Sequence, residues 1–373
     1  MIRFIKYLSL GTIVFNLPTF FIITLSSTLG AIFSALMFFS LLIYAIIEKE
    51  IIIINLLLIA GFGYFLISGI QFYVGDEREY FIKFIKYFWI IIIGTSLAAR
   101  TSKDELLVFL SIGAFSIFLH AIIFSSDYGR YSGFYLDPNT GGLICLMGYG
   151  LAINIANQKI RLPLLFLFTF AGIITFSRTF IVIWLIINFL SLRVDSKNYK
   201  IFGMGIGIVI LIISLAGILN FNTTRFSQLQ AIVNNEQVTK QDLNKGGRTE
   251  TWSKFYPYLS DKPFFGHGYR SFQGRGLNFV GSHNSFMMIY GESGIFVLLL
   301  FICFYLHLFY WGLKFFKEKP YILFLTIVQI LFLLTNHNYY TNYYLIFISL
   351  WLHIEVNKLK LVGSNNMQEQ PLI

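Results

Sequence analysis

The sequence predicts an all-α, polytopic membrane protein, and three observations predict it. Hydrophobic residues form 56% of the 373 residues, and charged residues form only 12%. Apolar runs close to the length of a bilayer-spanning helix recur along the chain. Basic residues are concentrated between alternate runs. A soluble protein would show polar faces at helical spacing, and stretches such as 51–58 and 88–93 have none.

The apolar runs predict about twelve transmembrane helices. We expect them at residues 8–25, 28–47, 51–73, 81–98, 106–124, 141–156, 162–176, 179–193, 201–219, 291–313, 320–336 and 342–355. Arg3 and Lys6 precede the first run as in a signal peptide. No small-residue cleavage site follows, however, and a second span comes directly after the first. We therefore expect a retained first helix.

Charge asymmetry predicts the topology. If the N-terminus is cytoplasmic, the inner connections contain Lys49, Arg100, Lys103, Lys159, Arg161, Arg193, Lys197, Lys200, Lys314, Lys317, Lys319, Lys358 and Lys360. The outer connections at 26–28 and 336–340 contain no Lys or Arg, and the one at 75–80 has one arginine among three acids. This distribution follows the positive-inside rule and favours cytoplasmic termini in a bacterial inner membrane.

The segment 162–192 is the ambiguous step in this topology. It is too long for one helix and slightly short for two. One helix would move all later basic connections to the outer side, against the positive-inside rule. A hairpin that turns at Ser177-Arg178 keeps them inside, so we expect Arg178 at the outer face.

The chain divides into four expected parts. Residues 1–219 hold the first nine spans, 220–290 form an extracytoplasmic loop subdomain, 291–355 hold the last three spans, and 356–373 form a cytoplasmic tail. The loop mixes aromatic residues with turn residues, unlike a flexible linker, so we expect it to be ordered and partly helical. The polar tail after Leu361 is expected to be disordered.

Composition also excludes several function classes. The formal charge is +10, but the basic residues are scattered between apolar segments, which disfavours nucleic-acid binding. Cys145 and Cys303 lie in separate apolar runs, so a disulfide framework is not expected. No His, Cys, Asp or Glu cluster has metal-ligand spacing, and no nucleotide-binding glycine loop is present. We expect neither a metal nor another cofactor.

Three residues on the expected outer side are candidates for chemistry. Arg178 interrupts apolar sequence, so it either faces an anionic partner or extends to the interface. Arg248 follows two glycines and opens an expected helix, where it could hold phosphate, although a solvated loop arginine is the alternative. His283 precedes the tenth span and would be a general base if nearby arginines lower its pKa. An isolated histidine without a function is the alternative.

Other outer residues are weaker candidates for substrate binding. In the loop 130–139, Arg130, Tyr131 and Asn139 could contact a sugar, and a structural turn is the alternative. Arg270 and Asn284 are further candidates. We expect His337, also on the outer side, to be an interfacial residue, and His120 and His353 to lie within spans.

The order of these motifs resembles the O-antigen ligase and O-antigen polymerase (Wzy-type) superfamily of bacterial membrane glycosyltransferases. The matching residues are Ser177-Arg178, Gly247-Arg248, Trp252, Lys262-Pro263, Gly266-His267-Gly268, His283-Asn284 and Glu292-Ser293-Gly294. The specific motifs cover Ser177-Arg178 and about 50 residues from Gly247 onward. The resemblance implies a GT-C-like membrane fold.

The resemblance implies a metal-independent glycosyltransferase with a glycan on undecaprenyl diphosphate as donor. It places Arg178 and Arg248 at the diphosphate and His283 near the acceptor hydroxyl. Attack opposite the diphosphate would invert the anomeric centre. The loop 130–139 resembles many polymerases, which favours an O-antigen or capsular polysaccharide polymerase over an O-antigen ligase that transfers to lipid A core. Membrane lipid, a glycan acceptor and a chain-length regulator are the expected partners.

Two non-enzymatic classes remain as alternatives. About twelve helices also suit a transporter of lipid-linked oligosaccharide, but no carboxylate lies near a mid-membrane position and no repeat symmetry is visible. A structural membrane protein would tolerate replacement of Arg178, Arg248 and His283 together.

Overall fold

The computed structural model describes residues 1–368 apart from 73–76, 125–130, 216–247, 275 and 279. Every extended regular element in these residues is a helix, as the sequence predicts. One isolated parallel β-bridge joins Phe72 to Tyr269. An all-helical chain suits a membrane because each helix satisfies its own backbone hydrogen bonds.

Each expected span coincides with a helix or a pair of helices. The helices are α1 (Ile2–Val14), α2 (Leu17–Thr24), α3 (Ser27–Glu48), α4 (Asn55–Ser68), α5 (Glu77–Arg100), α6 (Lys103–Ile123), α7 (Pro138–Ala152), α8 (Gln158–Ile174), α9 (Arg178–Ser191), α10 (Tyr199–Leu215), α13 (Arg248–Ser253), α14 (Tyr256–Asp261), α15 (Ser285–Ser293), α16 (Ile295–Lys314), α17 (Pro320–Leu333) and α18 (Tyr343–Gln368). Short 3₁₀ turns lie at Gly133–Tyr135, Ser196–Asn198 and Tyr339–Thr341.

The helices support an integral membrane protein, but they do not confirm a count of twelve spans. Among the described residues, α3, α5, α6 and α16 are long and apolar enough to cross a bilayer. The pair α1 and α2, bent by 57°, would make a fifth span. Helices α4, α9 and α17 each have 14 residues. Such a helix rises about 21 Å, less than the roughly 30 Å of a hydrocarbon core.

The first expected span contains a bend that the hydropathy pattern did not predict. Asn16 takes a left-handed conformation, with φ of 52°, between α1 and α2. Pro18 lies in the first turn of α2, where the absence of a backbone N–H is tolerated. The expected single helix over 8–25 is therefore two.

Several of the expected inner connections contact one another at one end of the molecule. The amine of Lys6 lies 2.6 Å from the carboxylate of Glu105. Arg100 pairs with Glu48 at 3.0 Å, and the amine of Lys358 donates to the carbonyl oxygen of Ala99 at 3.0 Å. These contacts join α1, the ends of α3 and α5, the start of α6 and the second half of α18.

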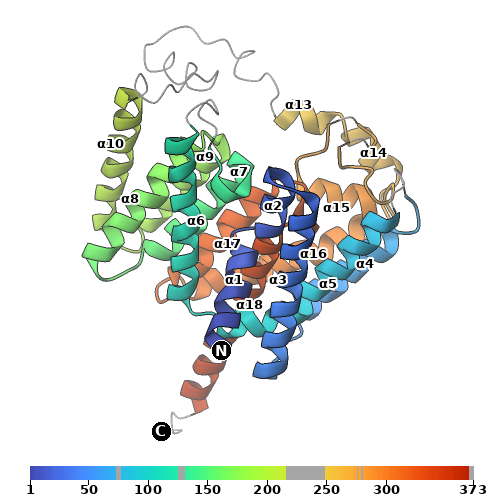
Figure 1. Cartoon of the computed structure of the whole chain (residues 1–373), viewed down its shortest axis with the longest axis horizontal. Helices are drawn as coiled ribbons and strands as arrows, with labels where there is room; N and C mark the ends of the chain where they lie inside the picture. The colour runs from blue at the N-terminus through green and yellow to red at the C-terminus, as the bar shows by residue number, and fades with distance from the viewer. Residues whose placement is uncertain (73–76, 125–130, 216–247, 275, 279, 369–373) are drawn as a thin grey trace.

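The opposite end carries α13 and α14 (Figure 1). In this view the start of α1 and the far end of α18 lie at the bottom, and α13 and α14 lie towards the top. The expected hairpin in 162–192 is present, because α8 ends at Ile174 and α9 begins at Arg178. The start of α1 and the far end of α18 therefore lie at one end of the bundle, and the two short helices lie at the other.

Helix α7 forms part of the core and supports this upper end. Each of its residues except Asn139 is buried. It packs against α6, α8, α9 and α17. Gly148 allows the ring of Phe168 on α8 to lie directly against the α7 backbone, where a β-carbon would overlap it. The core therefore fixes the N-terminus of α7, which faces the site described below.

Helix α18 is longer than the span expected at 342–355. Helix α18 continues to Gln368, past the expected end of the span at 355 and past Leu361. The segment after 355 contains several good helix formers, such as Lys358 and Leu359, and no proline until Pro371. The helix therefore continues into polar sequence.

Candidate functional site

The turn between α8 and α9 presents Arg178 at the start of α9. Ser177 caps this helix by accepting a hydrogen bond from the backbone N–H of Phe180 at 3.3 Å. The Ser177 hydroxyl also donates to Oδ1 of Asn139 on α7 at 2.9 Å. Ser177 is 1% exposed, whereas Arg178 is exposed. The buried serine thus fixes the point from which the arginine leaves the fold.

Arg248 lies within electrostatic reach of Arg178. It is the first residue of α13, as the sequence predicts, and its side chain is half-buried. Burial lowers the pKa of Arg248, the carboxylate of Asp137 raises it, and the positive charge of Arg178 lowers it. Two guanidinium groups from segments 70 residues apart therefore face the same region. Such a pair favours an anionic ligand.

Asp137 is the acidic member of this group. It caps α7 by accepting hydrogen bonds through Oδ2 from the backbone N–H of Thr140 at 3.0 Å and from the Thr140 hydroxyl at 2.9 Å. Its charge acts on Arg248 and on His283. One carboxylate thus partly offsets two arginines, so the region keeps a positive balance.

His283 faces the same group. Burial lowers the pKa of His283, the charge of Arg248 lowers it further, and Asp137 raises it. Because this pKa falls below its usual 6.5, the imidazole is neutral at pH 7 and can accept a proton. The electrostatic condition that the sequence predicts for a general base is therefore met.

A second histidine, His337, lies against His283. The backbone N–H of His283 donates to Nδ1 of His337 at 3.2 Å, and the ring centroids are 4.9 Å apart. His283 has a φ of 48°, which an L-residue rarely adopts without support. Burial, together with His283, Arg248 and Lys83, lowers the pKa of His337 to about 4. His337 is therefore neutral as well.

The Gly266-His267-Gly268 motif anchors the segment that leads to His283. The backbone N–H of His267 donates to the carbonyl oxygen of Gly291 at 2.7 Å, and that of Gly268 donates to the carbonyl oxygen of Glu292 at 3.2 Å. Gly268 has a φ of +88°, and a β-carbon there would overlap the backbone of Gln71. The motif thus attaches the loop to the end of α15 and to the segment after α4.

Glu292 holds the same loop from the inside. Its side chain is fully buried. It accepts hydrogen bonds from the hydroxyl of Tyr64 at 2.6 Å, from the backbone N–H of Phe272 at 3.1 Å and from the amide of Gln273 at 3.1 Å. A buried carboxyl group with three donors fixes α4, the loop and α15 relative to one another. The role of this motif residue is to position the loop.

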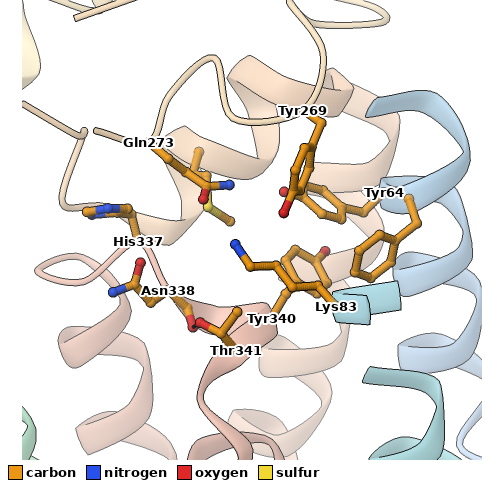
Figure 2. Close-up of a pocket in the computed structure, with 10 residues that line it drawn as sticks. Tyr64, Lys83, Tyr269, Gln273, His337, Asn338, Tyr340 and Thr341 are labelled. Carbon is orange, nitrogen blue, oxygen red and sulfur yellow. Dashed lines mark hydrogen bonds between the residues drawn. The ribbon is translucent and has the colours of Figure 1, made fainter. Parts of the chain in front are cut away.

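A small pocket with a cavity volume of about 20 Å³ lies beside His337 (Figure 2). It is lined by Tyr64, Phe65, Lys83, Tyr269, Gln273, Met288, His337, Asn338, Tyr340 and Thr341. These residues come from α4, α5, the loop before α15, α15 itself and the segment after α17. Figure 2 shows the amine of Lys83 within this group of side chains.

The three weaker candidates from the loop 130–139 differ in their burial and contacts. Arg130 lies outside the described residues. Tyr131 is fully buried, with its ring edge-on to His120 at 5.5 Å, which fits the structural alternative for that loop. Asn139 is half-buried and accepts from Ser177, so it supports the start of α9.

Asn284 and Arg270 also have structural contacts. Asn284 caps α15, where its Oδ1 accepts from the backbone N–H of Met287 at 3.1 Å. The Nη1 atom of Arg270 lies 2.6 Å from Oε2 of Glu79 on α5. Arg270 therefore joins the loop to α5, close to Lys83, which also pairs with Glu79 at 2.7 Å.

Sequence reasoning missed three members of the group. Asp137 and Lys83 were not singled out as site residues, and His337 was expected to be an interfacial residue. The available signal was the position of all three near outer ends of expected spans. The positions 137, 283 and 337 come together only through tertiary packing, which sequence periodicity does not show.

Among the described residues, no group of three or more His, Cys, Asp or Glu could hold a metal ion.

Residues 163–302 match the O-antigen ligase family. This match covers Arg178, Arg248, His283 and the glycine motifs, and it confirms the resemblance to the O-antigen ligase and polymerase superfamily. No curated protein matches the chain.

Proposed function

We propose that the protein is an inverting, metal-independent glycosyltransferase that polymerises O-antigen or capsular repeat units at the periplasmic face of the inner membrane. The donor is a glycan on undecaprenyl diphosphate, and the acceptor is another lipid-linked glycan. The observation that carries the proposal is the convergence of Arg178, Arg248 and His283, which come from three separate segments. The family match supports lipid-linked glycan as the substrate class.

The two arginines suit the diphosphate of the donor. The half-buried Arg248 and the exposed Arg178 repel each other, and a diphosphate would relieve this repulsion. Diphosphate is already a good leaving group, so two cations can stabilise the charge that develops as it departs. The exposed position of Arg178 suits a ligand that arrives from the membrane interface.

His283 suits the acceptor hydroxyl. The imidazole takes the proton from this hydroxyl, whose oxygen forms the new bond to the anomeric carbon. The bond from that carbon to the diphosphate oxygen breaks, and the leaving undecaprenyl diphosphate keeps the electron pair. Attack from the face opposite the leaving group inverts the anomeric centre. His283 then releases its proton to solvent.

The orientation in the membrane rests on charge. The end of the molecule with Lys6, Arg100 and Lys358 carries the basic connections, which favours its cytoplasmic location. The arginines and His283 then face the periplasm. No nucleotide is needed there, because the donor already carries its leaving group.

The catalytic proposal is tested with purified protein and a lipid-linked donor. His283→Ala and Arg248→Ala should lose turnover while they insert in the membrane and elute as the wild type does. Lys254→Ala is the matched control, since Lys254 is exposed and pairs with Glu250 on its own helix at 3.7 Å. Normal product from both site variants would overturn the proposal.

The acceptor is tested in a deletion strain by gel analysis of its surface glycans. Loss of a polymerase leaves a single repeat unit on the core. Loss of a ligase, which is the second candidate because of the family description, instead leaves polymer on the lipid carrier. Unchanged glycan would overturn both activities.

A further inference from the structure

Two lysines from separate helices lie against one aromatic ring at the end of α16. The amine of Lys314, the last residue of α16, lies 4.6 Å from the centre of the Trp311 ring. The amine of Lys360, in the second half of α18, lies 4.3 Å from the same centre. The two amines are therefore within about 9 Å of each other, a separation at which like charges still repel at physiological salt. The indole attracts both cations and brings them together.

The second contact of Lys360 leaves its charge in place. Lys360 is half-buried, and its amine lies 3.1 Å from Nε2 of His307, one turn before Trp311 on α16. An ammonium group only donates hydrogen bonds, so Nε2 of His307 accepts and carries no proton. The imidazole is then neutral. It orients the lysine without neutralising it.

Neither lysine is neutralised by an acid in the described part of the chain. No carboxylate there lies within ion-pair distance of the amine of Lys314 or Lys360. Glu355, on the same helix as Lys360, pairs with Lys358 at 3.0 Å. Glu318, in the turn after α16, is exposed and is flanked in the sequence by two further lysines. Positive charge is therefore in excess here, which favours an anionic ligand.

An exposed apolar stripe on α16 leads to the two lysines. It consists of Leu306, Tyr310 and Leu313, whose side chains are 57%, 60% and 52% exposed. Their spacing of four and three residues places them on one side of the helix. In an integral membrane protein such a stripe contacts acyl chains. Trp311 lies in the last turn of α16, a place typical of tryptophan at the membrane interface. The lysines therefore lie at the depth of the lipid head groups.

We propose that Trp311, Lys314 and Lys360 form a binding site for the head-group phosphate of an anionic phospholipid, whose acyl chains lie along the apolar stripe. A lipid bound there joins α16 to the end of α18. The charge pattern that favours a cytoplasmic location for this end places the site in the inner leaflet, whose anionic lipids attract basic segments. The inference goes beyond the proposed function, because lipid binding here does not depend on the transferase activity.

The test compares phosphatidylglycerol with phosphatidylcholine of the same acyl chains, which differ in the net charge of the head group. Native mass spectrometry of the full-length protein in a neutral detergent measures the apparent Kd of each lipid. The wild type should bind one phosphatidylglycerol roughly thirtyfold more tightly, since each lysine at an anionic membrane surface contributes about fivefold. Lys314→Gln and Lys360→Gln should each reduce this preference about fivefold, and the double variant should abolish it.

Two control variants separate the site from the overall charge of the protein. Lys159→Gln removes an exposed lysine at the start of α8, on the same expected inner side, and should keep the preference. Lys360→Arg retains the positive charge at the site and should keep it as well. Should Lys360→Gln fail to elute as a folded protein, Lys314→Gln provides the same comparison, because Lys314 is exposed.

Equal binding of the two lipids to the wild type would overturn the inference, and so would a preference that survives in the double variant. An equal loss of preference in Lys159→Gln would also overturn it, since the effect would then follow net charge. Competition by inorganic phosphate at the concentration of the lipid would show a site for a soluble anion, which would contradict a phospholipid site.

Failure here is separable from failure of the proposed function. A wild type that turns over a lipid-linked donor without any phosphatidylglycerol preference removes only the lipid site. A phosphatidylglycerol preference without turnover removes the transferase and keeps the lipid site.

Discussion

The backbone N–H of His283 donates to Nδ1 of His337 at 3.2 Å, which ties the segment before α15 to the segment after α17. The same pair of rings lies edge to face, with centroids 4.9 Å apart. His337 is thus a positioning residue for His283, whose left-handed φ of 48° needs this support. The proposed base depends on a contact across 54 residues of sequence.

Replacing His337 tests this dependence. His337→Ala removes the acceptor for the His283 backbone and should lower kcat by roughly a hundredfold, the cost of a small misplacement of a catalytic group. His337→Asn places an amide oxygen near the position of Nδ1 and should recover most of kcat. Steady-state kinetics with a lipid-linked donor measures both. Equal losses in the two variants would contradict the positioning role.

The pH profile of His283 should respond oppositely to its two charged neighbours. Below its pKa the imidazole is protonated and cannot act as a base, so kcat/KM should fall at acid pH. Arg248 lowers this pKa, so Arg248→Gln should move the acid limb to higher pH. Asp137 raises it, so Asp137→Asn should move the acid limb to lower pH.

The asparagine variant makes this a controlled comparison, because asparagine also caps helices well and should keep the start of α7 in place. Both variants lose activity at their optimum, so the position of the acid limb is the measurement. Shifts in the same direction, or no shift, would show that His283 is not the titrating base.

Hydropathy and the alternation of basic connections were sufficient to predict the helices and the Ser177-Arg178 turn. Both properties can be seen in short stretches of sequence, without knowledge of the tertiary contacts. The bend at Asn16 was missed, since a straight helix and a broken pair of helices give the same hydropathy pattern. The number of spans stays a prediction beyond the four or five that length and composition support.

The sequence indicated candidate site residues where a residue type was unusual for its position. Arg178 in apolar sequence and Arg248 after two glycines stood out, and the charge of Arg178 acts on Arg248, which in turn acts on His283. His337 did not stand out in the sequence, because its contact with His283 forms only when the chain folds. The burial of Tyr131 could not be predicted, since an aromatic residue in a loop can be either exposed or buried.

Gly268 should be intolerant of a side chain. Its φ of +88° and the closeness of the Gln71 backbone leave no room for a β-carbon. Gly268→Ala should destabilise the fold by at least about 1–3 kcal/mol through backbone strain alone. Gly203 in α10 is the control, because a β-carbon there has no neighbour within 4 Å. Thermal unfolding in detergent should show a lower Tm only for Gly268→Ala, and equal Tm values would contradict the anchoring role of this loop.

Ser177 and Ser26 separate helix capping from site positioning. Each caps a helix, Ser177 through the backbone N–H of Phe180 at 3.3 Å and Ser26 through that of Leu29 at 3.2 Å. Replacing either by alanine should cost about 1 kcal/mol of stability. Only Ser177 also donates to Asn139 and precedes Arg178, so only Ser177→Ala should raise the KM for the lipid-linked donor. A similar KM in both variants would mean that Arg178 does not depend on this cap or does not bind the donor.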